Sequence, residues 1–152
     1  MASSPDRTGQ PAPRNPDGTP AAGHRTLPHT ADMRIEAWAP TLQECLTEAA
    51  RAMVESFTDL SHAKPTAVRE FPLENNDPEN LLLSLLEELI YRMDAHAELP
   101  LSITLHGSQA RCTMTDTTRL PTLGAVPKAV SRADLHVTKT PNGWHCTATV
   151  DV

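Results

Sequence analysis

Three anionic groups stand at the ends of two short extended segments of the sequence. Asp32 precedes an alternating apolar segment, and Asp151 is followed by Val152, which adds its own carboxylate at the end of the sequence. Clustered oxygen ligands are what a hard divalent cation prefers. If the two segments are neighbouring strands, these carboxylates could converge on a cation. The alternative is that Asp32 only caps or turns the chain entry and that Asp151 is a solvated terminal residue, because lone acids at strand ends usually serve solubility.

Two further side chains could take part in such chemistry. Lys128 stands in the otherwise apolar segment 125–131. A lysine there could contact a phosphate or a partner carboxylate, but a lysine that keeps a loop or strand edge soluble is the commoner case. His29 could be a ligand or a proton carrier, although a histidine that is hydrogen-bonded locally in a turn is the commoner case.

No recognised catalytic motif accompanies these residues. The sequence contains no nucleophile elbow, no phosphate-binding P-loop, no dinucleotide-binding glycine motif and no HExxH zinc motif. Its seven histidines are scattered without the spacing of metal ligands. We therefore expect a protein that is not an enzyme on its own.

Two alternating segments must position the carboxylates. Residues 33–38 and residues 144–150 both alternate apolar and polar side chains, which predicts half-buried strands. In the later strand, Trp144, Cys146, Ala148 and Val150 are expected to face the core, and Asp151 to face outward. The Asn142-Gly143 pair before it predicts a tight hairpin that joins the last two strands.

Two amphipathic helices are predicted between these strands. Thr41 and Glu44 form a capping-box sequence, and apolar residues at helical spacing extend the first helix over about 42–58. Asp77 and Pro78 are typical of a helix start, and a broad leucine-rich stripe carries the second helix to about residue 95. Further strands are predicted over 68–73, 101–105 and 111–117 and around residues 135–137.

The order of these elements predicts an α+β fold, in which two amphipathic helices pack on one face of a mostly antiparallel β-sheet. A loop is expected over 118–129. Residues 1–24 are rich in Pro and Gly and contain almost no large apolar side chains, which predicts a disordered extension. The folded domain is therefore expected over 25–152.

The composition limits the classes of partner. Acidic residues outnumber basic residues by 19 to 13, which gives a net charge of -6. Direct nucleic-acid binding is not expected, because affinity for phosphates rests on clustered Lys and Arg. The three cysteines have no CxxC spacing and lie in apolar patterns, so we expect buried thiols in a reducing, cytoplasmic compartment. No signal segment and no run of 18 apolar residues is present, so no membrane insertion is expected.

A series of motifs along residues 28–152 resembles the archease family. The series begins with His29-Thr30-Ala31-Asp32, then Trp38 and Pro40-Thr41-Leu42-Gln43-Glu44. It continues with Thr58-Asp59-Leu60-Ser61, the leucine-rich helix with Asp94 near its end, Lys128-Ala129-Val130, Gly143-Trp144 and Val150-Asp151-Val152. The occurrence of all these motifs in order is more specific than any one of them.

The resemblance implies an activator or adaptor of an RtcB-type RNA ligase in tRNA splicing and RNA repair. Such a protein promotes guanylylation and turnover of the ligase and meets RNA only through it. The resemblance further implies a divalent cation, commonly calcium, with Asp32, Asp151 and Val152 as its ligands, and a role for Lys128 in activating the partner.

One departure and two alternatives accompany this prediction. Where the family usually continues with Thr, Tyr and His after the Lys-Ala-Val segment, this chain has Ser131, Arg132 and Ala133, which could alter ligase contact or activation. One alternative is a general chaperone or modulator of nucleic-acid-modifying proteins. The other is a hydrolase that acts alone, using the acidic cluster with a metal.

Overall fold

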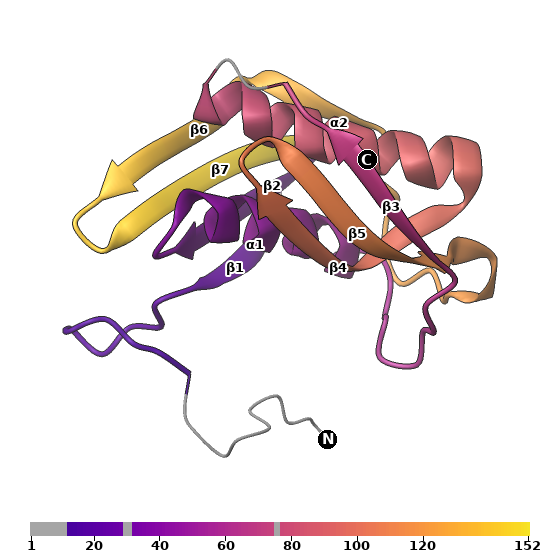
Figure 1. Ribbon diagram of the computed structural model, residues 1–152, viewed down its shortest axis with the longest axis horizontal. Helices are drawn as coiled ribbons and strands as arrows, with labels where there is room; N and C mark the ends of the chain where they lie inside the picture. Colours follow the sequence, from indigo (N-terminus) through magenta and orange to yellow (C-terminus); the bar gives the residue numbers. More distant parts are fainter. Residues whose placement is uncertain (1–11, 29–31, 75–76) are drawn as a thin grey trace.

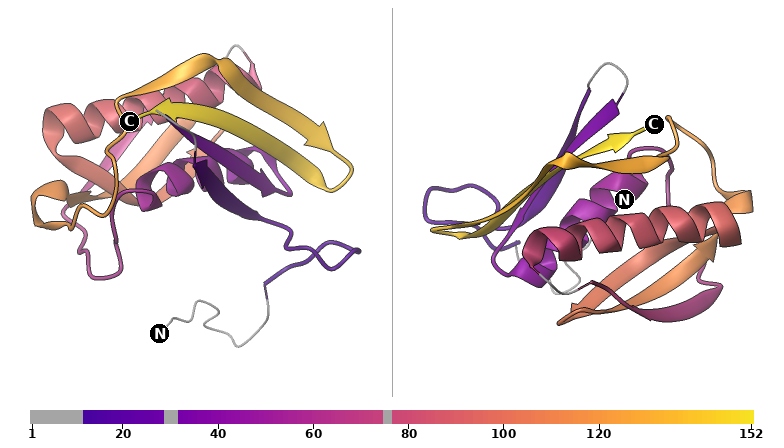
Figure 2. Two further views of the ribbon diagram at one scale, coloured as in Figure 1. Left: turned by 180° about the vertical axis from the view of Figure 1, so that it is seen from behind. Right: turned by 90° about the horizontal axis from the view of Figure 1, so that it is seen from above.

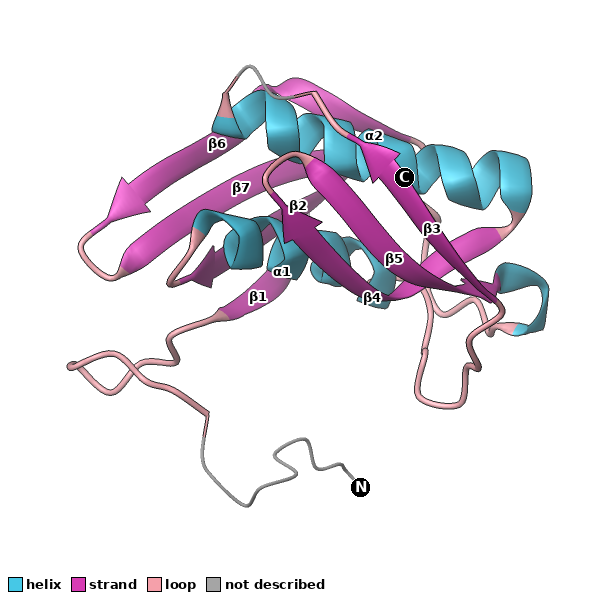
Figure 3. Cartoon of the chain, in the orientation of Figure 1, coloured by secondary structure: helices cyan, strands magenta, loops and turns pink. Residues whose placement is uncertain are grey.

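The structure is a computed structural model that describes residues 12–28, 32–74 and 77–152. The chain forms two helices and seven strands in these residues (Figures 1 and 3). In chain order they are β1 (Gly23–Pro28), β2 (Asp32–Ala39), α1 (Leu42–Glu55), β3 (Ala67–Pro72), α2 (Pro78–His96), β4 (Glu98–His106), β5 (Gln109–Asp116), a short 3-10 helix (Thr117–Arg119), β6 (Ala129–Thr140) and β7 (Gly143–Asp151).

The strands form two separate antiparallel sheets. The first has the order β1-β2-β7-β6 and the second the order β3-β5-β4. Both helices lie between them: α1 contacts β2, β7 and β4, while α2 contacts β6 and β4 (Figure 2, right). The predicted α+β class, with two helices and antiparallel strands, is confirmed, but the strands form two sheets on either side of the helices where a single sheet was expected.

The second sheet follows from the width of the apolar helix faces. The side chains that α1 buries extend from Cys45 to Val54, and those that α2 buries extend from Leu81 to Leu89. At 3.6 residues per turn, each set spans more than half of the helix circumference. A single sheet cannot cover so wide a face, so the strands cover the helices from two sides.

Local signals in the sequence set the helix starts. The Thr41 hydroxyl accepts a hydrogen bond of 3.2 Å from the backbone N–H of Glu44, and the Asp77 carboxylate accepts one of 2.8 Å from Asn80. Pro78 occupies the first turn of α2, where no partner for a backbone N–H is needed. The first helix is shorter than predicted, since it ends at Glu55 rather than near residue 58.

Strand β1 is an element that the sequence pattern did not indicate. It pairs along β2, with Gly23 opposite Trp38 and Arg25 opposite Glu36. Before it, residues 12–22 include a turn in which the backbone N–H of Asn15 donates to the Thr19 carbonyl at 2.8 Å. The domain boundary between residues 24 and 25 stays a prediction.

The last two strands are joined as predicted, with a longer sixth strand. Thr140 and Gly143 pair across the hairpin, and Cys146, Ala148 and Val150 are buried in the core. Strand β6 begins at Ala129 rather than near residue 135, and its pairing with β7 shifts between Ser131 and His136. In the part of the chain that the structure describes, neither helix has the length and apolar character needed to cross a membrane.

Candidate functional site

Asp32 and Asp151 stand directly opposite each other at one end of the four-stranded sheet. Asp32 begins β2, Asp151 ends β7, and the two are Cα partners in the antiparallel pair. The buried apolar residues of both strands alternate with them, so both carboxylates lie on the face of the sheet away from the helices. Side chains at opposed positions have Cβ atoms about 4.5–5.5 Å apart. Val152 is the next residue after Asp151. We call Asp32, Asp151 and Val152 the acidic tip.

The third segment at this end of the sheet carries Lys128. Its backbone N–H donates a hydrogen bond of 2.8 Å to the Asp151 carbonyl, and the next residue, Ala129, is the Cα partner of Asp151 in β6. The Lys128 side chain is exposed. The structure therefore brings together, from three distant segments, the residues that the sequence singled out. His29 lies outside the described residues.

The donor chemistry of the acidic tip fits a hard cation. Two opposed carboxylates supply oxygen ligands of the kind that calcium prefers. Their like charges also repel, and a bound cation would relieve this repulsion. Among the described residues, no group of three or more His, Cys, Asp or Glu side chains could hold a metal. A full ligand set would thus need Val152 and solvent, and cation binding stays a prediction.

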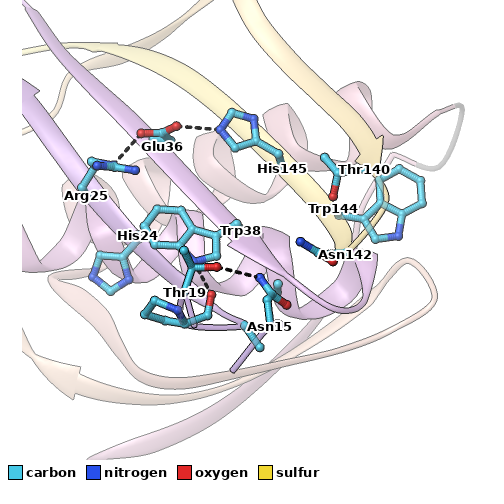
Figure 4. Close-up of a pocket in the computed structure, with 13 residues that line it drawn as sticks. Asn15, Thr19, His24, Arg25, Glu36, Trp38, Thr140, Asn142, Trp144 and His145 are labelled. Atoms are coloured by element: carbon cyan, nitrogen blue, oxygen red, sulfur yellow. Dashed lines mark hydrogen bonds and ion pairs between the residues drawn. The ribbon is translucent and has the colours of Figure 1, made fainter. Parts of the chain in front are cut away.

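A pocket at the opposite end of the same strands was missed by the sequence analysis. It lies between the turn before β1 and the β6–β7 hairpin (Figure 4), and its lining includes Trp38 and Trp144. The Trp38 indole N–H donates to the Pro20 carbonyl at 3.2 Å. A Cβ added to Gly23 would come within 2.7 Å of the Trp38 ring. The Trp38 ring thus fixes the N-terminal turn to the sheet.

An ion-pair network crosses the outer face of the sheet and forms part of the lining of this pocket. Arg25 Nε lies 2.6 Å from one oxygen of Glu36, and His145 Nε2 lies 2.7 Å from the other (Figure 4). The hydrogen bond from His145 and the charge of Arg25 lower the pKa of Glu36 below its usual value. The network links β1, β2 and β7 side by side.

His24 holds β1 against the first helix. Its Nδ1 lies 2.7 Å from Glu48 and its Nε2 lies 2.8 Å from Glu55. These two carboxylates raise the pKa of His24 to about 9. Both ring nitrogens are then protonated at neutral pH and both donate. This arrangement is structural, since the two carboxylates bind opposite sides of the ring and do not converge on a common point.

The cysteines are buried and free, as predicted. The Sγ atoms of Cys45 and Cys146 lie 3.5 Å apart between α1 and β7. The neighbouring Cys45 thiol and burial raise the pKa of Cys146. Burial likewise raises the pKa of Cys112 to about 12. Thiols held in their neutral form are poor nucleophiles, so these residues act as small core side chains.

Comparison with known proteins gives a consistent result along the chain. Residues 24–152 match the model of the archease protein family. A probable protein archease of Mycobacterium tuberculosis is 43% identical over 138 residues, which cover 87% of this chain and 76% of that protein. A protein archease of Saccharolobus islandicus is 33% identical over 131 residues, covering 82% and 94%.

Two solved structures share the fold. The crystal structure of a Thermotoga maritima protein, described as an archease and possible chaperone, has a TM-score of 0.65 at 19% identity, covering 83% of this chain and 94% of that chain. The solution structure of a Methanobacterium thermoautotrophicum protein has a TM-score of 0.69 at 20% identity, covering 86% and 99%.

Proposed function

Since the chain belongs to the archease family, we propose that it is a non-catalytic activator of an RtcB-type RNA ligase in tRNA splicing and RNA repair. Family membership supports a role that assists another protein, in the manner of a cofactor protein or chaperone. The observation that carries the finer proposal is the meeting of Asp32, Asp151 and Lys128 at one end of the sheet.

The acidic tip is proposed to hold a divalent cation, with calcium as the first candidate. Asp32 and Asp151 would be its side-chain ligands, and Val152 would complete the protein's share of the set. A cation held there would supply positive charge to a phosphoryl group in the ligase during guanylylation. The exposed side chain of Lys128 would pair with a carboxylate or phosphate of the ligase.

RNA and nucleotide are assigned to the ligase in this proposal. The net charge of -6 opposes direct binding of a polyanion. The carboxylates of the acidic tip would likewise repel phosphate unless a cation is present. This chain would therefore act on the ligase active site through contact with the ligase and would meet RNA only there.

The test is ligase guanylylation with GTP and calcium, followed by RNA joining. We expect wild-type protein to accelerate both steps, and Asp32→Asn and Asp151→Asn to lose most of the acceleration. Asp134→Asn is the matched control, because Asp134 is also an exposed carboxylate of the four-stranded sheet but lies at the irregular part of β6. Wild-type protein that fails to accelerate a cognate ligase would refute the proposal.

A second candidate is a general chaperone or modulator of nucleic-acid-modifying proteins. It is favoured by the description of the Thermotoga maritima structure as a possible chaperone. This candidate predicts protection of several unrelated client proteins from aggregation, with no requirement for Asp32 or Asp151. Aggregation assays with the same variants separate it from ligase activation. A further assay without ligase, on a phosphoester substrate, tests the hydrolase alternative.

A further inference from the structure

A groove runs beside the acidic tip, between the second half of α2 and the segment that leads into β6. Its volume is about 740 Å³, and its lining includes Tyr91 on α2 and Val126 in the segment before β6. Lys128 belongs to the same lining. Because the backbone N–H of Lys128 donates to the Asp151 carbonyl, this end of the groove lies next to the acidic tip.

The groove exposes two large hydrophobic side chains on the surface of the domain. Tyr91 is 54% exposed and Val126 is 40% exposed, and both are among the few large hydrophobic side chains that the described residues leave exposed. The Tyr91 ring meets the edge of His96 with a centroid distance of 5.4 Å, which leaves most of its surface to solvent. Clustered exposed apolar groups with a polar rim mark interaction surfaces.

Charge identifies the kind of partner. Glu87 and Asp94 flank Tyr91 on α2, four residues before it and three after it, so all three share one helix face. The neighbouring Glu88 forms an ion pair with Arg92, with 3.0 Å between Glu88 Oε2 and Arg92 Nε. Within the described part of the chain, no ion pair is found for Glu87 or Asp94. Two carboxylates without an ion pair among the described residues, beside an apolar anchor, complement a basic peptide segment and repel RNA phosphate.

We propose that this groove binds a segment of the ligase that presents an apolar side chain to Tyr91 and Val126 and a Lys or Arg to Glu87 and Asp94. The identity of the partner rests on the function proposed above. Docking in the groove positions the ligase next to Lys128 and the acidic tip. The groove then supplies affinity, while the tip supplies activation.

This division of roles is tested by titrating each variant into the guanylylation assay and measuring direct binding to the ligase by calorimetry. We expect Tyr91→Asp, and the double variant Glu87→Lys with Asp94→Lys, to raise the half-maximal concentration at least tenfold and to reach the wild-type maximum. Asp32→Asn is expected to lower the maximum and to leave the half-maximal concentration unchanged. Val68→Asp is the matched control, because Val68 is 51% exposed on β3 of the other sheet.

The outcomes separate this inference from the function on which it rests. Wild-type affinity of Tyr91→Asp for the ligase would overturn the groove inference and leave ligase activation standing. If the wild-type protein binds the ligase without activating it, and Tyr91→Asp does not bind, the groove inference would be supported and the activator role overturned. Two other results would assign the groove to another occupant and overturn the inference. In the first, sedimentation shows that the wild-type protein is a dimer and that Tyr91→Asp is a monomer. In the second, the protein binds a labelled RNA hairpin without ligase, and Tyr91→Asp does not.

Discussion

The backbone N–H of Lys128 donates to the carbonyl of Asp151 at 2.8 Å, so the main chain rather than the lysine side chain joins this segment to β7. We therefore expect Lys128→Ala to change the free energy of unfolding by less than about 0.5 kcal/mol, as for an exposed side chain, while ligase activation falls. Lys128→Pro removes the N–H and is expected to lower the melting temperature. Thermal unfolding and the guanylylation assay check both statements. Equal melting temperatures for the two variants would contradict this role of the main chain.

Calcium is expected to stabilise the wild-type protein against heat. A ligand that binds only the folded state adds about 2.7 kcal/mol when its concentration is 100 times its dissociation constant. The rise in melting temperature should disappear in Asp32→Asn and Asp151→Asn and should persist in Asp134→Asn. A chelator should lower the wild-type melting temperature to the metal-free value. Calorimetric titration with calcium measures the same site directly, and equal heats in all four proteins would rule out the tip as the binding site.

The pair of carboxylates around His24 makes stability depend on pH. The folded-state pKa of about 9 lies above the ordinary value of 6.5, so folding binds the proton more tightly. The resulting stability is fully present below pH 6.5 and is lost as pH rises through 9. Because His24 and its two carboxylates are partly exposed to solvent, we expect a modest effect. His24→Gln should lower the free energy of unfolding by about 1–2 kcal/mol at pH 6 and by almost nothing above pH 10.

Denaturant unfolding at a series of pH values measures this difference. His106→Gln is the control, because His106 is an exposed residue at the end of β4 and has no ion pair among the residues that the structure describes. A constant gap between wild type and His24→Gln from pH 6 to pH 10 would show that the histidine acts by packing and not by charge.

Crowding at the β6–β7 hairpin makes Gly143 hard to replace. Its φ is 138°, and an added Cβ would collide with the Ala39 carbonyl and lie 2.7 Å from Pro40 Cα. We expect Gly143→Ala to cost about 2–4 kcal/mol. Gly107 also has a positive φ, of 61°, but no atom lies within 4 Å of an added Cβ, so Gly107→Ala should cost only about 1 kcal/mol. The denaturant midpoints of the two variants measure this difference, because Gly143→Ala combines backbone strain with a collision and Gly107→Ala has the strain alone.

Local signals in the sequence were sufficient for most elements of the fold. Alternation placed β2 and β7, Asp77 and Pro78 marked the start of α2, and Asn142-Gly143 marked the hairpin. Strand β1 could not be predicted from the pattern of side chains. It pairs along one side only, and its Arg25 and Leu27 side chains are both exposed, so apolar and polar residues do not alternate along it. The shift in pairing within β6 likewise interrupts the two-residue period.

The site was harder to predict than the elements, because it depends on the order of the strands. The sequence identified Asp32, Asp151 and Lys128 as candidates, but their meeting was conditional on β2 and β7 being neighbours. That pairing joins distant segments and leaves no local trace in the sequence. The groove beside Tyr91 could not be predicted for a related reason. The leucine-rich pattern of α2 indicates one buried stripe, and no local signal indicates that another part of the helix lines a groove.

The pairing of Asp32 with Asp151 also has a consequence for the order of folding. The three-stranded sheet and α2 come from one continuous stretch, Ala67–Asp116, and can form through contacts of short sequence separation. The four-stranded sheet needs both early and late parts of the chain, and such long-range pairing is slow because a large loop must close first. A chain emerging from the ribosome therefore acquires the three-stranded sheet before the acidic tip. Any product whose synthesis stops before β7 lacks the tip, even if the rest of its core is folded.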